Sequence, residues 1–374
     1  MKIHILTMSA GSGHNIVSNN LKMQFEKLGN QVLVTNIYES KKRLLNLNNK
    51  GLIFIIKHFP NTYSMIWHKL KKQNPENRYK NEIQKWIKPI YGDVKNKIIK
   101  FNADVIVCTH YYASTIVCNI KRENLLNKKT KIYAILTDLL PHPFWESSIL
   151  CDKIFTPSLD CFDELIKKGF VASQILPFGY PVSLKFGEPF DVIKYKKRLN
   201  LSDKFTILLV NGSVPSTAYL KIIKSLSKNN NVQMISVSGN NKKAFEKIEK
   251  YINKHNVENT INIGYCSEME KVMRVSDIIV TKCGCTTLFE AINSNLPIAT
   301  VTKTYINEHE NQQILKEKNI LLKFKNYREF VKWVNVADNK QVILKSMRKA
   351  MQQYKNPNAI ADICNYVINN KKPT

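Results

Sequence analysis

The sequence contains no apolar run long enough to cross a membrane as a helix. A spanning helix needs about 18 or more consecutive apolar residues, whereas the run from Gly51 to Phe59 is broken by Lys57 and His58. The amino terminus begins directly with a strand-like pattern, Met1 to Leu6, and lacks the cleavage pattern of a signal peptide. We therefore expect a cytoplasmic protein without a membrane-spanning helix.

The sequence also lacks a disulfide framework and a zinc site. Its eight cysteines have no regular spacing, so reduced thiols are expected. Cys283 and Cys285 form a Cys-x-Cys pair, but no second pair of ligands lies near them in the sequence, which excludes a structural zinc site. The first glycine-rich turn is followed by neither the third glycine of a dinucleotide fingerprint nor the Gly-Lys-Ser/Thr of a P-loop.

Acidic residues are scarce. The chain has 29 Asp and Glu against 57 Lys and Arg, a net charge of +28, and residues 41–100 alone hold fifteen basic and three acidic residues. An excess of this size implies an anionic partner, either nucleic acid or an anionic lipid surface. Compositional drift toward lysine is the alternative, and it explains the total charge better than the clustering.

The length and the periodicity predict an α/β protein of two domains. The chain has 374 residues, of which 44% are hydrophobic, enough for two packed cores. Short apolar runs alternate with helical patterns in both halves, which predicts two doubly wound, Rossmann-like parallel sheets facing each other across a cleft. We expect the first domain over residues 1–185, a linker over 186–203 and the second domain over 204–340.

The stretch from Thr281 to Asn311 has the features of an anion site. It follows a short apolar strand pattern, and Gly284 precedes a helix that Thr286 and Thr287 can cap. The free N–H groups and the dipole of a helix amino terminus bind anions. Glu290 lies about one turn into this helix, where its carboxylate can accept hydrogen bonds from the two hydroxyls of a ribose.

At these residues the chain resembles glycosyltransferases that use UDP-sugars on lipid acceptors, namely the monogalactosyldiacylglycerol synthases and the processive diacylglycerol glucosyltransferases. The lipid II N-acetylglucosaminyltransferase is a more distant relative. Their pattern is Lys-x-Gly-Gly-x-Thr, then Glu-Ala, Leu-Pro and Gln-Glu-x-x-Asn. The chain keeps Lys282, Gly284, Thr286, Glu290, Ala291, Leu296, Pro297, Glu308 and Asn311. It departs at Cys285, where the family has the second glycine, and at Asn307, where it has glutamine.

The resemblance covers nearly the whole chain and implies the GT-B architecture, with an acceptor- and membrane-binding first domain and a UDP-sugar-binding second domain. Residues 341–374 would hold a helix that crosses back to the first domain. The turn at 211–213 would form a second nest for the diphosphate. The implied donor-binding residues are Asn211, Gly212, Ser213, Tyr265, Lys282, Gly284, Cys285, Thr286, Thr287, Glu290, Glu308 and Asn311.

Two motifs in the first half resemble the acceptor side of the same enzymes. The turn at residues 9–14 is similar to the family's Ser-x-Gly-x-Gly-His, and residues 137–145 match its Thr-Asp-x-x-x-His-Pro-x-Trp. The resemblance implies a role in proton transfer for His14 and Asp138. The implied acceptor-side residues are Gly11, Ser12, Gly13, His142, Pro143 and Trp145. The alternative is structural: the glycines make a tight turn, His14 caps a helix and Asp138 caps a turn.

Residues 40–100 interrupt the alternation of strands and helices. Aromatic residues such as Phe54, Phe59, Trp67 and Trp86 stand among many lysines. A basic amphipathic segment of this kind suits the plane of a membrane interface. A helical hairpin that packs on the core, with its lysines in water, is the alternative.

These features predict a glycosyltransferase that moves a hexose from UDP-glucose or UDP-galactose to diacylglycerol or a glycosyl-diacylglycerol, at the cytoplasmic face of an anionic membrane. No Asp-x-Asp occurs, so we expect no metal and no cofactor, with backbone N–H groups stabilising the leaving UDP. A nucleotide-sugar 2-epimerase of the same fold is one alternative, against which the basic apolar segment argues. A nucleic-acid-binding protein is the other, but the aromatic residues form no stacking platform, so no nucleic-acid partner is expected.

Overall fold

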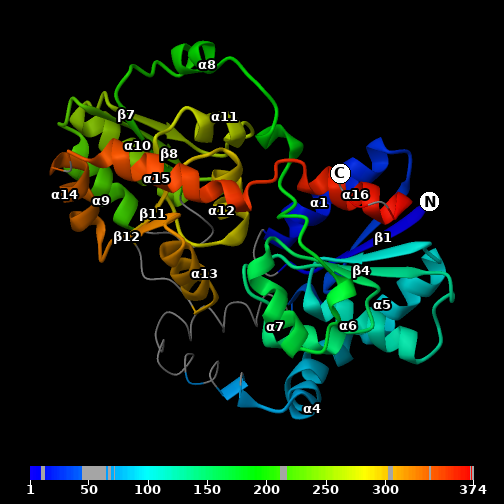
Figure 1. The fold of residues 1–374 in the computed structure, drawn as a ribbon. Helices are drawn as coiled ribbons and strands as arrows, with labels where there is room; N and C mark the ends of the chain where they lie inside the picture. Colours follow the sequence, from blue (N-terminus) through cyan, green and yellow to red (C-terminus); the bar gives the residue numbers. More distant parts are fainter. Residues whose placement is uncertain are drawn as a thin grey trace. The chain divides into compact units, whose positions relative to one another are not determined.

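A computed structural model describes residues 1–9, 13–43, 65, 69–70, 72–210, 217–301, 306–336, 338–370 and 372. Figure 1 shows the helices and strands of this part of the chain. The chain divides into two compact units. The first unit consists of Met1–Ser183 and Asn358–Thr374, and the second unit of Leu184–Pro357.

The first unit is built on a parallel sheet. Over the described residues this sheet has six strands in the order β2-β1-β3-β4-β5-β6. A parallel sheet is covered on both faces, which explains why every residue of Val105–Cys108 is apolar and buried. The strands are β1 Lys2–Thr7, β2 Gln31–Asn36, β3 Val105–Cys108, β4 Lys131–Ile135, β5 Lys153–Phe155 and β6 Ile175–Leu176.

The helices of the first unit bury apolar stripes against this sheet. In the first helix, Val17, Leu21 and Phe25 are buried at the four-residue spacing of one helix face. The helices are α1 Gly13–Lys27, α4 Pro75–Arg78, the π-helix η2 Tyr79–Ile83, α5 Gln84–Phe101, α6 Tyr111–Arg122, α7 Phe162–Lys167 and α16 Ala359–Asn369. The 3-10 turns are η1 Glu39–Lys41, η3 Pro143–Ser148, η4 Leu159–Cys161 and η5 Ala172–Gln174. Helix α16 packs beside α1 (Figure 1).

The second unit has the same kind of architecture, a parallel sheet with helices. Its described strands form another parallel sheet of six, in the order β12-β11-β10-β7-β8-β9. The strands are β7 Phe205–Val210, β8 Val232–Val237, β9 Thr260–Ile263, β10 Ile278–Val280, β11 Ile298–Thr300 and β12 Leu321–Lys323. The helices are η6 Leu184–Phe186, α8 Val192–Arg198, α9 Thr217–Leu226, α10 Lys242–His255, α11 Met269–Arg274, α12 Cys285–Asn293, α13 Ile306–Glu317, α14 Tyr327–Val336, α15 Lys340–Met351 and η7 Gln352–Tyr354.

The predicted fold class, two doubly wound parallel sheets, is confirmed. The chain segments fall into the units as follows. The stretch expected as a linker, residues 186–203, contains helix α8 and belongs to the second unit. The stretch expected as a returning helix, residues 341–374, divides between α15 in the second unit and α16 in the first.

The described part of the basic segment forms core-packed helices. In α5, Ile87, Ile90, Val94 and Ile98 are buried, whereas the lysines of this helix are mostly exposed. Trp86 is half-buried and packs against the same core. From residue 75 onward, therefore, the helical-hairpin interpretation fits, and Trp86 is not exposed as an interface residue would be. Phe54, Phe59 and Trp67 lie outside the described residues.

None of the described helices is both long enough and apolar enough to cross a bilayer.

Candidate functional site

Three neighbouring strands of the first unit end at one edge of the sheet, and polar residues follow each of them. His14 lies in the first turn of α1 after β1, Thr109 follows β3, and Thr137 and Asp138 follow β4. In an open α/β sheet, ligands bind at the carboxyl ends of the strands. Gly13 begins α1, whereas Gly11 and Ser12 lie outside the described residues.

The His14 imidazole is held through one ring nitrogen. Its Nδ1 lies 2.8 Å from the Thr109 carbonyl oxygen and 3.0 Å from Thr137 Oγ1. Because a carbonyl oxygen can only accept, Nδ1–H is the donor, and Nε2 carries the lone pair. Burial lowers the pKa of His14 below its ordinary value of 6.5, and the Thr109 hydrogen bond only partly opposes this. A neutral imidazole with a basic Nε2 can accept a proton.

His14 lies at the border of a cluster of aromatic rings. His110 lies edge-on to it, with ring centroids 4.8 Å apart, and the Tyr111 ring stacks on His142 at 4.5 Å. His110 Nδ1 accepts the Tyr112 N–H at 3.1 Å as the N-cap of α6. Burial, together with the neighbouring His14 and His142, lowers the pKa of His110 well below its ordinary value. The cluster therefore favours neutral imidazoles.

The second acceptor-side motif is largely buried. His142 is half-buried, and its Nδ1 accepts the Phe144 N–H at 3.1 Å. Pro143 is buried, and Trp145 is only 2% exposed in the core of the first unit. Trp145 therefore supports the loop from inside, and within this motif His142 and Asp138, both half-buried, have accessible surface.

In the second unit, the turn between β10 and α12 has the geometry of an anion site. Gly284 is the N-cap of α12 in an extended conformation, with φ −79°, so the backbone itself does not require glycine there. A Cβ at Gly284 would meet nothing closer than Glu308 Oε1 at 4.0 Å. The half-exposed Thr286 and Thr287 follow in the first turn of α12. The helix amino terminus with its N–H groups is the part that suits a phosphate.

Two residues of helix α13, Glu308 and Asn311, form hydrogen bonds with this turn. Lys282 Nζ donates to Glu308 Oε1 at 2.9 Å. Asn311 Nδ2 donates to the Cys283 carbonyl at 3.1 Å and to Cys285 Sγ at 3.3 Å. The thiol that replaces the family's second glycine is buried and joined to Asn311. Asn311 is itself 4% exposed, so its amide holds the turn.

Glu290 has an unusual electrostatic environment. It is half-buried on α12, and burial together with the negative charge of Glu270 raises the pKa of its carboxyl to about 8. Ionising it in the free protein is therefore costly, and a hydrogen-bond donor at this point would reduce the cost. Tyr265, expected beside the nucleotide base, is 74% exposed. Asn211, Gly212 and Ser213 lie outside the described residues.

Comparison with known proteins finds one family model for each half of the chain. The family model described as Monogalactosyldiacylglycerol (MGDG) synthase matches residues 14–182, and that of the Glycosyltransferase family 28 C-terminal domain matches residues 206–365. The processive diacylglycerol beta-glucosyltransferase of Bacillus licheniformis is 26% identical over 396 residues, which cover 100% of this chain and 97% of that enzyme. The chain joins a monogalactosyldiacylglycerol synthase domain to a glycosyltransferase family 28 C-terminal domain.

Two further similarities concern the sequence and the fold. The probable monogalactosyldiacylglycerol synthase of Glycine max is 25% identical over 312 residues, covering 79% of this chain and 57% of that protein. The crystal structure of Acinetobacter baumannii MurG has a TM-score of 0.65 at 14% identity, covering 98% of this chain and 99% of that one. The likeness to MurG concerns the fold alone. The sequence matches favour a glycosyltransferase over the 2-epimerase and the nucleic-acid-binding protein.

Several residues of this glycosyltransferase's candidate site were not predicted from the sequence. Thr109 and Thr137 hold His14, His110 packs on it, and Tyr111 packs on His110. In the second unit, Tyr219 lies near Glu308 and Cys283, and Glu270 lies near Glu290. The signal for the first four was the position of Thr109-His110-Tyr111 and Thr137 directly after apolar strand patterns. Tyr219 and Glu270 lie inside helices and carried no comparable signal.

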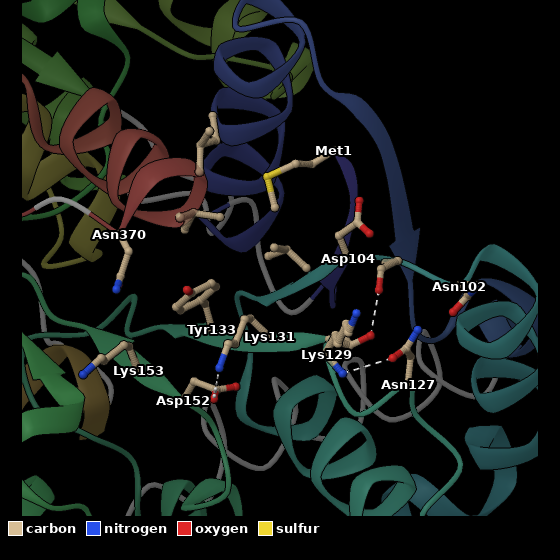
Figure 2. A pocket seen from close by; sticks show the side chains of 15 residues that line it. Met1, Asn102, Asp104, Asn127, Lys129, Lys131, Tyr133, Asp152, Lys153 and Asn370 are labelled. Atoms are coloured by element: carbon tan, nitrogen blue, oxygen red, sulfur yellow. Dashed lines mark hydrogen bonds and ion pairs between the residues drawn. The ribbon is translucent and has the colours of Figure 1, made fainter.

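A cavity of about 780 Å³ lies at the opposite, amino-terminal edge of the sheet in the first unit (Figure 2). Asp104 and Asp152 line it, and each accepts a backbone N–H at the beginning of a strand. Lys131 Nζ lies 3.6 Å from Asp152 Oδ1, the ion pair that Figure 2 marks. None of the predicted site residues lines this cavity.

Proposed function

We propose that this chain transfers a hexose from a UDP-sugar to diacylglycerol or a glycosyl-diacylglycerol at a membrane surface. The observation that carries the proposal is the His14 imidazole, whose Nδ1–H is held by the Thr109 carbonyl and whose Nε2 carries the lone pair. The relatives named for diacylglycerol glucosylation and for monogalactosyldiacylglycerol synthesis support the substrate class.

The acceptor side would work by general base catalysis. Nε2 of His14 takes the proton of the lipid hydroxyl while the hydroxyl oxygen forms a bond to carbon 1 of the hexose. The bond from carbon 1 to the diphosphate oxygen breaks, and UDP leaves with the electron pair. The Thr109 carbonyl stabilises the resulting imidazolium through Nδ1–H. Asp138, at the same sheet edge, adds negative charge that favours this cation.

The donor side would stabilise the charge that develops on UDP. The N–H groups at the start of α12, beginning at Gly284, and the helix dipole act on the diphosphate. Lys282, held by Glu308, adds a positive charge next to this turn. Glu290 accepts hydrogen bonds from the ribose hydroxyls. In this arrangement the backbone N–H groups of α12 and Lys282 act on the leaving UDP, and no metal takes part.

Product analysis tests this function directly. We expect the purified chain to form a glycolipid from diacylglycerol vesicles with UDP-glucose or UDP-galactose, and comparison of the two donors identifies the hexose. Mass spectrometry of the lipid extract shows how many hexoses are added. Absence of lipid-linked hexose with both donors, from a protein that binds UDP, would contradict the proposal.

We further propose that the protein docks as a peripheral protein on the cytoplasmic face of an anionic membrane through the basic segment at residues 41–100. The described lysines Lys69, Lys72 and Lys80 of this segment are exposed. Each lysine near an anionic surface contributes about 1 kcal/mol of binding free energy. The acceptor lies in the bilayer, so a basic surface beside the first unit's site would hold the enzyme at its substrate.

The triple variant Lys69→Gln, Lys72→Gln, Lys80→Gln is therefore expected to sediment less with anionic liposomes and to turn over more slowly on vesicles. Added salt should weaken the binding of the unaltered protein, because exposed charges are screened. The matched control replaces three exposed lysines of α10 in the second unit, Lys242, Lys243 and Lys250. If both triple variants sediment alike at low salt, the docking surface lies elsewhere.

A further inference from the structure

One arginine of the basic segment is buried. Arg78, the last residue of α4, is 4% exposed. Its Nη1 donates to both carboxylate oxygens of Glu146 at 2.8 Å, and its Nη2 donates to the Gln73 carbonyl. Arg78 therefore does not belong to the solvated lysines around it.

The partner of Arg78 directly follows the acceptor-side motif at residues 137–145. Glu146 belongs to η3, which begins one residue after His142. Arg78 Nη1 also lies 3.5 Å from the Pro143 carbonyl oxygen. Within the same turn, the Phe144 N–H donates to His142 Nδ1 and the Trp145 N–H to the His142 carbonyl, each at 3.1 Å. The backbone that Arg78 holds is thus the backbone that orients the His142 ring.

Stability alone is a weak explanation for this ion pair. The pKa of Glu146 is raised, because burial outweighs the attraction of Arg78. Moving two charges from water into the protein interior costs more free energy than forming an ion pair at the surface. Replacing a buried ion pair by apolar residues is often neutral or stabilising. A planar guanidinium that contacts two carboxylate oxygens and a carbonyl does fix geometry, which an apolar contact does not.

We propose that Arg78 is a positioning residue for the lipid acceptor: it ties helix α4, within the basic segment, to η3 and so holds His142 against Tyr111. The inference rests on the proposed function, because that function makes η3 part of the acceptor side. Arg78 itself touches no reacting atom. It acts through Glu146 and the 142–146 backbone.

The decisive variant replaces both partners by apolar residues, Arg78→Met with Glu146→Leu. We expect its Tm to stay within a few degrees of the unaltered protein and its UDP affinity to be unchanged, since the predicted donor site is in the second unit. We expect kcat/KM for the lipid to fall about ten- to hundredfold through a higher KM for the lipid, the scale of a misplaced substrate-positioning group. KM for the UDP-sugar should not change.

Two single variants support the double one. Arg78→Lys keeps the charge but has a single nitrogen, so it cannot contact Glu146 and the Gln73 carbonyl from two nitrogens as the guanidinium does. It should therefore raise the lipid KM as well. Arg78→Met alone leaves Glu146 buried without its cation and should lower Tm, which Glu146→Leu then restores without restoring the lipid KM. The matched control is the exposed pair Lys167–Glu164 of α7 in the same unit, at 2.8 Å and outside the basic segment. Its replacement by Met and Leu should leave the lipid KM unchanged.

Hydrogen exchange gives a readout that needs no turnover. We expect the Phe144 and Trp145 amides to exchange faster in the double variant and in Arg78→Lys. The amides of the central strand β3 should exchange at the same rates as in the unaltered protein. Wild-type lipid KM and wild-type exchange in either folded variant would overturn the proposal. Failure of the unaltered protein to transfer any hexose would overturn the proposed function instead, and the exchange measurement would still decide whether Arg78 orders the loop.

Discussion

Replacing His14 by alanine is expected to lower kcat by about 10²–10⁴-fold, the usual contribution of a positioned general base. UDP affinity should stay nearly unchanged, because His14 lies in the first unit and the predicted donor site in the second. Turnover on diacylglycerol vesicles and UDP calorimetry measure the two effects. A His14 that only caps the turn would instead lower Tm and leave the folded fraction fully active.

The environment of His14 also predicts the pH profile. Since burial lowers the pKa of His14 below 6.5, the acidic limb of kcat/KM should fall at a pH below that of an ordinary histidine. Thr137→Val removes one of the two contacts at Nδ1 and should cost about two- to tenfold in kcat, the range of a single neutral hydrogen bond. An acidic limb at or above pH 6.5 would contradict this assignment of the base.

Replacing Glu290 by alanine is expected to weaken UDP binding by about 1.5–3 kcal/mol, the range of hydrogen bonds to a charged group. That range corresponds to roughly ten- to hundredfold in Kd. The fold should survive the substitution. Ionising the Glu290 carboxyl in the free protein is costly, so its charge does not stabilise the folded state. Glu246→Ala, an exposed carboxylate on α10, is the control. Equal Kd values for Glu290→Ala and the unaltered protein in calorimetry would rule out the ribose contact.

The raised pKa of Glu290 makes binding depend on pH. Below about pH 8 the free carboxyl is protonated, so accepting both ribose hydroxyls requires loss of a proton, and affinity for a UDP-sugar should rise as pH rises toward 8. The free energy of unfolding of the protein without ligand depends on pH in the opposite direction. The stability that goes with the protonated Glu290 carboxyl is present at low pH and is lost as pH rises through 8. Glu290→Gln cannot ionise and should abolish both dependences.

Much of the fold could be predicted from local patterns. Apolar strand runs and four-residue helical spacing repeat every few residues, so they indicate where β3 or α1 lies without knowledge of distant contacts. The same patterns place His14, Asp138 and Gly284 after strands, at the sheet edge where ligands bind. The basic segment was harder, because lysines among aromatic residues are compatible both with a membrane interface and with a helix packed on the core.

The sequence by itself determined the two α/β units, the candidate residues at the strand ends and the excess of positive charge. Only the tertiary structure decided which nitrogen of His14 is basic, because the Thr109 carbonyl that holds its proton is 95 positions away in the chain. It likewise decided that Asn311 holds the Cys283–Cys285 turn and that Arg78 is buried against Glu146. Periodicity records which side of an element faces the core, whereas hydrogen-bond partners and proton affinities depend on residues that folding brings together from distant segments.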